Sequence, residues 1–192
     1  MKLIENIKIF FGNYFFKKEY SALKRDVIVN NIENATTVGL IFHADSEENY
    51  KIISRFILQI KKEGVKEIKI LGFVNAKNLP SYLSPKLGQN FMLKKDLNWH
   101  LKPVSNSALN FIYDPFDILI DLTTENIFPL KCILGMSRAH FKVGRGEDEK
   151  NILLDMIINT EKAKGLEELA KQILYYLKQI NKVDGDVLAM LK

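Results

Sequence analysis

The sequence predicts a three-layer α/β/α domain, in which helices cover both faces of a mostly parallel sheet and an amphipathic helix is added at the N-terminus. Residues 36–42 and 117–122 are short, apolar and rich in β-branched side chains, as in strands buried on both faces. Such segments alternate with stretches whose apolar residues recur every three or four positions. The 192 residues fit one domain. We expect an N-terminal helix and linker over 1–30 and a single α/β domain over 31–192.

Residues 2–25 are predicted to form the added helix. Six aromatic residues fall within eleven positions, and the segment holds six basic and two acidic residues, a net +4 of the total +5. A broad apolar arc in a soluble protein normally becomes core or interface, so we expect it to pack on the sheet or on a second subunit. Binding to an anionic membrane surface is the alternative. The aromatic residues are Phe10, Phe11, Tyr14, Phe15, Phe16 and Tyr20.

The next three elements form a strand, helix, strand unit. After the strand at 36–42, Asp45 and Ser46 offer N-cap oxygens to a helix over 46–63, which ends before Gly64. Residues 67–73 are the second strand. A right-handed crossover should place both strands parallel in one sheet.

The second half of the chain carries mixed signals. Residues 74–110 hold three prolines and only a short candidate strand at 91–93. Strands are then predicted at 109–113, 117–122, 140–143 and 152–158. Helices are predicted at 129–136 and 166–180, and a charged loop at 144–150.

Composition restricts the class of protein. Cys132 is the only cysteine, so no intrachain disulfide can form, and its apolar helical context predicts a buried thiol rather than a nucleophile. Glu5 and Lys8 interrupt the first apolar stretch, so no secretory signal is expected. No apolar run approaches a membrane span. We therefore expect a cytoplasmic protein, with the N-terminal helix as the one candidate for membrane association.

Neither a metal nor a cofactor is expected. His43, His100 and His140 are far apart in sequence and lack the spacing of zinc ligands. The turns after the strands at 36–42 and 67–73 lack the glycines that let a backbone approach a dinucleotide. Nucleic acid is an unlikely partner because the basic residues form no dense stripe.

Polar residues directly after the predicted strands are the first candidates for ligand binding, because ligands of open α/β sheets bind beyond the carboxyl ends of the strands. The structural alternative is local: Asp45 caps a helix, His43 ends a strand and Asp121 binds a backbone amide. The candidates are His43, Asp45, Asn75, Asp121 and Thr123.

A run of cationic or titratable residues is the candidate for anion binding, since no Asp or Glu occurs between Glu125 and Glu147. We prefer the alternative that the first two lie near a helix end and that the others are solvated, with His140 and Lys142 on one exposed strand face. The run comprises Lys131, Arg138, His140, Lys142 and Arg145.

Several segments together resemble a bacterial family of uncharacterised proteins: the basic, aromatic first helix, VGLIFHAD, KKDLNWHLKP, FIYDPFDILIDLT and FPLKCILGMSRAHFKVG. The resemblance covers nearly the whole chain and implies a Rossmann-like domain without implying an activity. Residues 116–144 are also similar in rhythm to the acceptor half of heptosyltransferase-type glycosyltransferases. Those enzymes need a second α/β domain for the sugar nucleotide, and we expect no room for one here.

The sequence therefore leaves the function open. Our leading hypothesis is a non-catalytic module that binds a small polar ligand or a protein partner. The alternatives are a transferase-like acceptor domain that uses Asp121 and its neighbours, and a peripheral membrane adaptor held by the first helix. Homo-oligomer formation through that helix is a further expectation.

Overall fold

The computed structural model describes residues 2–84, 88–147, 150–159 and 165–180. Its core is a six-stranded sheet in the order β3-β2-β1-β4-β5-β6, and every pair of neighbouring strands is parallel. The domain is therefore Rossmann-like, as predicted. The strands are β1 (Thr37–His43), β2 (Glu67–Val74), β3 (Gln89–Leu93), β4 (Ile118–Asp121), β5 (Phe141–Arg145) and β6 (Met156–Ile158).

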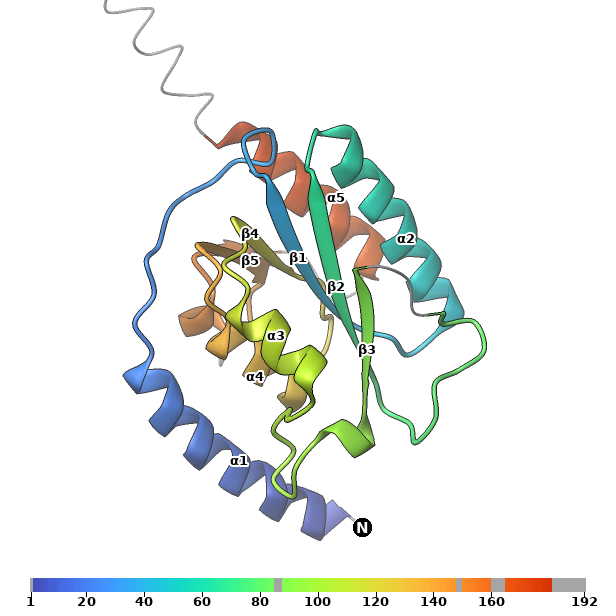
Figure 1. Cartoon of the computed structure of the whole chain (residues 1–192), viewed down its shortest axis with the longest axis vertical. Coiled ribbons are helices and arrows are strands. Elements are labelled where there is room, and N and C mark those ends of the chain that lie inside the picture. The colour runs from blue at the N-terminus through green and yellow to red at the C-terminus, as the bar shows by residue number, and fades with distance from the viewer. Residues whose placement is uncertain (1, 85–87, 148–149, 160–164, 181–192) are drawn as a thin grey trace, which may run out of the picture.

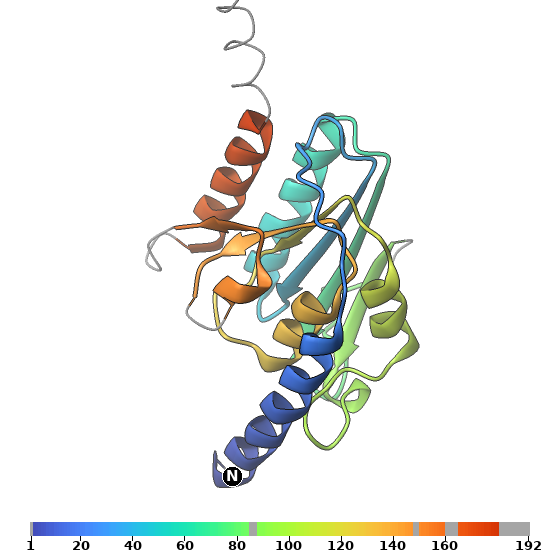
Figure 2. The same ribbon diagram turned by 90° about the vertical axis from the view of Figure 1, so that its left-hand side faces the viewer.

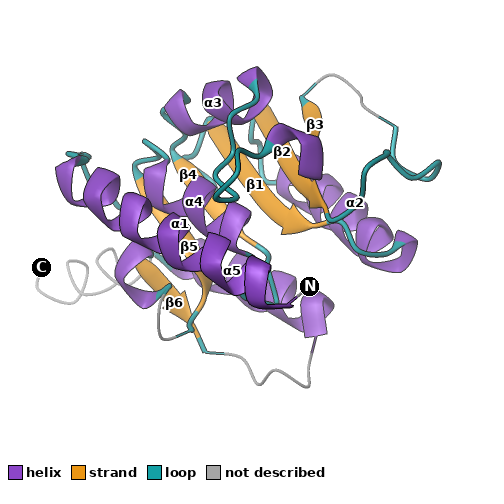
Figure 3. Ribbon diagram, turned by 90° about the horizontal axis from the view of Figure 1, so that it is seen from below, coloured by secondary structure: helices purple, strands orange, loops and turns teal. Residues whose placement is uncertain are grey.

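Helices cover both faces of the sheet (Figures 1 and 3). The apolar side chains of α2 and α5 pack in one core, and those of α3 and α4 pack in a second core on the opposite face. The first helix, α1, lies outside α4. The helices are α1 (Lys2–Ala22), α2 (Glu47–Lys62), α3 (Asn106–Tyr113), α4 (Phe128–Met136) and α5 (Gly165–Gln179).

The two central strands confirm the predicted pattern. Val38 of β1 is paired with Ile68 of β2 on one side and with Ile118 of β4 on the other, and five successive residues of β1 are buried. Helix α2 begins where predicted: the Ser46 hydroxyl accepts a hydrogen bond from the Asn49 amide at 3.2 Å. Beyond the helix, Gly64 adopts a φ of 96°, which side chains disfavour.

Helix α1 ends at Ala22, three residues before the predicted end. The following residues leave the helix, and Arg25 donates to the carbonyls of Ala139 and His140 instead. The face of α1 that meets α4 buries Phe16. Within the described part of the chain, no helix is both long and apolar enough to cross a membrane.

One predicted strand was wrong and another was too long. Residues 109–113 belong to α3, because the Ser105 hydroxyl caps a helix by accepting from the Ala108 amide at 3.4 Å, a signal upstream of the predicted segment. Residues 152–158 form strand only over β6, since 151–153 are a short 3₁₀ helix.

Smaller corrections concern the element ends. β3 extends two residues before the predicted 91–93. β5 runs to Arg145 and so includes the start of the predicted charged loop at 144–150, of which 148–149 lie outside the described residues. Pairing of Gly144 with Asp121 of β4 and with Ile157 of β6, and of Arg145 with Ile158, extends the strand.

Candidate functional site

The strand order places a switch point at the carboxyl edge of the sheet. From β1 the chain first extends the sheet through β2 and β3, and then returns to the other side of β1 for β4. Loops at such an edge diverge and leave space for a ligand. The prominent cavity of the described residues lies at this edge, under α1.

This cavity, hereafter the α1 cavity, has a volume of about 590 Å³. That volume lies within the range typical of small-molecule sites, roughly 300–1,000 Å³. Its walls come from four parts of the chain: α1, the end of β2, the 94–101 segment, and the 126–131 segment at the start of α4. The polar and charged lining residues are Glu5, Lys8, Asn13, Asn75, Lys94, Asn98, Asn126 and Lys131, and the others are Ile9, Phe73, Leu97, Trp99, Leu101, Ile127, Phe128 and Pro129.

Close packing brings α1 over the cavity. Gly12 allows this approach: a Cβ atom there would lie 2.6 Å from the Phe128 ring and 2.7 Å from the carbonyl oxygen of His100. Polar contacts fix the same helix, since Lys102 donates to Glu19 at 2.5 Å and Lys131 donates to Asn13 at 3.1 Å. The helix is thereby a fixed wall of the cavity.

The 94–101 wall is held by its own hydrogen bonds. The side-chain oxygen of Asn98 accepts from the amides of His100 and Lys102, at 3.2 and 2.9 Å. Leu101 has a φ of 66°, a left-handed conformation that is uncommon for a residue with a side chain. Burial, followed by the charge of Lys102, lowers the pKa of His100. The segment presents Trp99 at the cavity from a defined turn.

Positive charge predominates in the lining. Three lysines, Lys8, Lys94 and Lys131, line the cavity, against one carboxylate, Glu5, among the described lining residues. Lys131 is only 5% exposed, and its ammonium lies 5.7 Å from the centroid of the Phe16 ring in addition to its bond with Asn13. The arrangement favours a ligand that carries negative charge.

The ligand candidates from the sequence are not all at the cavity. Asn75 lines it. The His43 ring lies against Phe73, with the centroids 6.2 Å apart, and its Nδ1 is 3.9 Å from a Glu125 carboxylate oxygen. Asp45 accepts from the side-chain amide of Asn49 at 2.8 Å, at the start of α2. His43 and Asp45 are absent from the described cavity lining.

Asp121 and Thr123 belong to a buried polar cluster instead. One Asp121 oxygen accepts from the Thr123 amide at 2.9 Å, as the structural alternative expected, and the other lies 3.3 Å from the Lys150 ammonium. Lys150 also donates to the Thr123 hydroxyl. Arg145 donates to the carbonyl of Thr124 nearby. Asp121 is 1% exposed, and its contacts with Thr123 and Lys150 connect the segments that follow β4 and β5.

The cationic run does not form one surface. Lys131 lies at the α1 cavity, whereas Arg138 lies over the Tyr113 ring, 4.8 Å from its centroid. Lys142 and Arg145 are buried, at 1% and 4% exposure, so their expected solvation was wrong. Both side chains are buried because they bind backbone carbonyls of other segments, and the alternation of side chains along a strand does not reveal such partners. His140 is half-buried and stands at the junction with the 23–31 linker.

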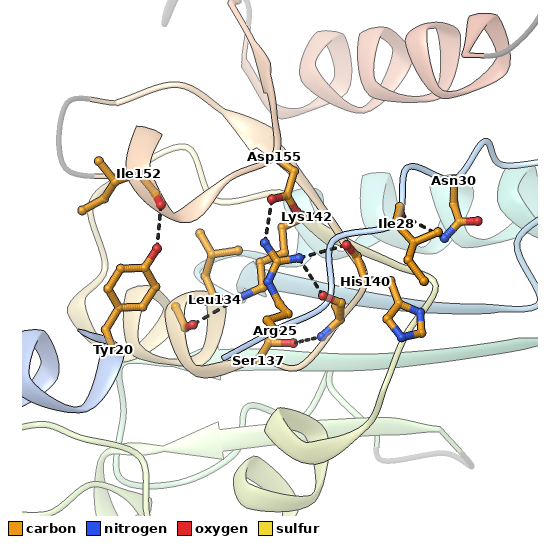
Figure 4. Close-up of polar contacts among 12 residues, drawn as sticks. Tyr20, Arg25, Ile28, Asn30, Leu134, Ser137, His140, Lys142, Ile152 and Asp155 are labelled. Atoms are coloured by element: carbon orange, nitrogen blue, oxygen red, sulfur yellow. Dashed lines mark hydrogen bonds and ion pairs between the residues drawn. The ribbon is translucent and has the colours of Figure 1, made fainter. Parts of the chain in front are cut away.

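Lys142 holds the end of α4 (Figure 4). Its ammonium nitrogen donates to the carbonyls of Leu134 and Gly135 at 2.7 and 3.1 Å. Asp155 accepts from the Lys142 amide and from Arg25. Burial, followed by the charge of Arg25, lowers the pKa of Lys142 to about 7, against the opposing charge of Asp155. A neutral amine retains two N–H groups, enough for both carbonyls.

This shift predicts a stability that rises with pH above about 7. The pKa of Lys142 is about 7 in the folded chain, against 10.5 for a free lysine. In that interval the unfolded chain binds more protons, so the free energy of unfolding should increase by up to about 1.4 kcal/mol per pH unit. Urea unfolding between about pH 7 and pH 9 measures the slope.

The matched variant Lys142→Met should lose this slope over the same interval. In the natural chain, the rise of the free energy of unfolding with pH should weaken above about pH 9, because burial raises the pKa of the Cys132 thiol from 9.0 to about 12. Above that pH the unfolded chain loses the thiol proton that the folded chain keeps, so the thiol lowers the free energy of unfolding while Lys142 raises it. An equal slope in the variant and the natural chain would show that Lys142 is not the titrating group.

Sequence reasoning missed most of the cavity lining. The α1 wall ends fifteen residues before β1 begins, and the 94–101 wall directly follows β3, so only the folded approach of these two segments makes a site. Trp99, in a proline-bounded segment, was the available signal, because tryptophan joins a large apolar ring to a polar N–H group and is enriched at interfaces.

One comparison with known proteins gives a match. The model of a family described as "Family of unknown function (DUF6913)" matches residues 8–180. Neither a curated protein nor a solved structure matches the chain. The similarity of residues 116–144 to heptosyltransferase-type enzymes stays a prediction.

Proposed function

Since the chain belongs to this family of unknown function, we propose a role from its own geometry: the protein binds a small, negatively charged molecule in the α1 cavity. The observation that carries the proposal is a cavity of about 590 Å³ at the carboxyl edge of a parallel sheet, with three lysines in its lining. Both the position and the volume are those of small-molecule sites in α/β domains.

The inner face of α1 supports a ligand-binding role. A helix that only packed against the domain would present apolar side chains, as α1 does at Phe16. Toward the cavity it presents three polar or charged side chains, Glu5, Lys8 and Asn13, beside the single apolar Ile9. Such polar groups fix the orientation of a bound molecule by hydrogen bonds.

The other lining groups define the class of ligand. Lysine ammonium groups bind carboxylate or phosphate oxygens. The amides of Asn75, Asn98 and Asn126 can both donate and accept, which suits hydroxyl groups. The rings of Phe73 and Trp99 offer apolar surface to a carbon skeleton. We therefore propose a small carboxylate or phosphate ester with a polar body.

A thermal-shift screen tests this proposal with inorganic phosphate, citrate and glucose 6-phosphate, and with glucose as the uncharged counterpart. We expect at least one anion to stabilise the full chain, because a ligand at about 100 times its Kd adds about 2.7 kcal/mol. That corresponds to several degrees for a chain of this size. Trp99, the only tryptophan, gives an independent fluorescence signal at the cavity.

Charge reversal should localise the binding. Lys94→Glu changes an exposed lining residue and is expected to weaken anion binding at least tenfold without a change in the unfolding midpoint. Lys95→Glu is the matched control, since Lys95 is also exposed but is absent from the described lining. If both variants weaken binding equally, the anion binds by general surface charge. If every anion fails to stabilise the natural chain, the proposal is wrong.

A further inference from the structure

Helix α1 is apolar on two opposite faces. With 100° between successive residues, Gly12 and Phe16 fall on the side that packs against the domain. Residues on the other side are exposed, with exposed fractions between 40% and 70%. They are Ile4, Ile7, Phe10, Phe11 and Tyr14. We call this set the outer face of α1.

Trp99 extends the outer face beyond the helix. It is 58% exposed, and its ring centroid lies 5.6 Å from that of Phe11, which in turn lies 5.7 Å from that of Phe10. In Figure 2, which views this side of the molecule, α1 is outermost and no described element lies in front of it. A contiguous aromatic surface of this kind marks an interaction site rather than scattered surface residues.

The charges around the outer face are positive. Lys17 and Lys18 follow it by one turn and are exposed. The two acidic residues of α1 lie on the other side of the helix: Glu19 accepts from Lys102, and Glu5 lines the α1 cavity. The exposed side of α1 is therefore apolar over the outer face and cationic in the turn that follows it.

This distribution of apolar and charged residues favours an anionic lipid surface over a second copy of the chain as the partner. In an antiparallel pair of two α1 outer faces, Lys17 and Lys18 of one copy would lie against Ile4 and Ile7 of the other, without an acidic partner. An anionic lipid surface accommodates both halves, because aromatic and aliphatic side chains enter the boundary of the acyl chains while lysines contact the headgroup phosphates. Tyrosine and tryptophan are the residues that favour that boundary.

We propose that the outer face of α1, together with Trp99, docks this protein on the surface of an anionic membrane. The helix lies in the plane of the interface and does not cross the bilayer. The residues of α1 that dock lie on the opposite side of the helix from Glu5, Lys8 and Asn13, which line the α1 cavity. Trp99 belongs to both surfaces, since it lines the cavity and extends the outer face.

Vesicle co-sedimentation of the full chain tests the docking. Vesicles of phosphatidylcholine alone are compared with vesicles that also contain phosphatidylglycerol. We expect binding to the anionic vesicles only, weakening as salt increases. A blue shift of fluorescence should accompany binding, because Trp99 is the only tryptophan and lies on the docking surface.

Variants on the exposed surface should separate apolar from electrostatic contributions. Phe10→Ser with Tyr14→Ser should reduce vesicle binding at least tenfold. Tyr175→Ser with Tyr176→Ser is the matched control on α5, where both tyrosines are exposed, and should leave binding unchanged. Lys17→Gln with Lys18→Gln should weaken binding roughly fivefold for each lysine removed.

Three results would overturn the docking proposal. The first is the absence of binding to anionic vesicles. The second is that the Lys17→Gln, Lys18→Gln double variant, whose apolar surface is unchanged, binds anionic vesicles as tightly as the natural chain. The third is a concentration-dependent dimer in sedimentation velocity, without vesicle binding, that Phe10→Ser with Tyr14→Ser abolishes; a second copy would then be the occupant.

Discussion

Asp121→Ala is expected to lower the free energy of unfolding by about 3–5 kcal/mol, the usual effect of removing one member of a buried ion pair. The side chains of Asp121 and Lys150 are each 2% exposed, and their charged atoms are 3.3 Å apart. Without the carboxylate, the Lys150 ammonium would stay buried near the Thr123 hydroxyl and would lose the one ion pair that it makes within the described part of the chain. The Thr123 amide would also lose its acceptor.

The double variant Asp121→Ala with Lys150→Met is the control. It removes both charges, so it should recover a large part of the lost stability, since an apolar replacement of a buried pair is often nearly neutral. Urea unfolding of the three proteins measures the differences. A loss below about 1 kcal/mol for Asp121→Ala would contradict the structural role, and would return Asp121 to the list of ligand candidates.

Gly12→Val should separate α1 from the domain and remove anion binding. The new Cβ atom would meet the His100 carbonyl oxygen at 2.7 Å, and backbone does not yield as a flexible side chain does. Overpacking of this kind costs about 1–3 kcal/mol. Because α1 forms one wall of the cavity, its displacement should also weaken anion binding at least tenfold.

Local helix propensity does not explain such a loss, because valine is a better helix former than glycine. Asn6→Val is the matched control: Asn6 is exposed on the same helix and is absent from the described cavity lining. It should change neither the unfolding midpoint nor the anion affinity measured by Trp99 fluorescence. If Gly12→Val behaves like Asn6→Val, α1 does not wall the binding site.

Much of the fold could be predicted because local signals agreed with it. The strand of which Val38 is part is apolar along its length, and α2 has a cap, a stripe and a glycine stop in the right order. Residues 109–113 failed because their apolar run is as compatible with a buried helix as with a strand. The Ser105 cap was the deciding signal.

The candidate site was less predictable because it depends on distant segments. The search beyond the strand ends found Asn75 but could not show that α1 returns to the same edge, since the close contact of Gly12 with His100 is tertiary. Asp121 was selected for its position, yet its partner Lys150 lies 29 residues further along the chain. Position at a strand end therefore did not distinguish a ligand-binding carboxylate from a structural one.

The α1 cavity as an anion site is tested most directly by an amide ¹H–¹⁵N spectrum of the 22.1 kDa chain titrated with citrate. Saturable shifts are predicted for the amides of the cavity walls, among them Lys8, Asn75, Asn98 and Asn126. They should diminish in Lys94→Glu and persist in Lys95→Glu. Shifts confined to the neighbourhood of Arg138 and His140, or shifts that never saturate, would contradict binding in this cavity.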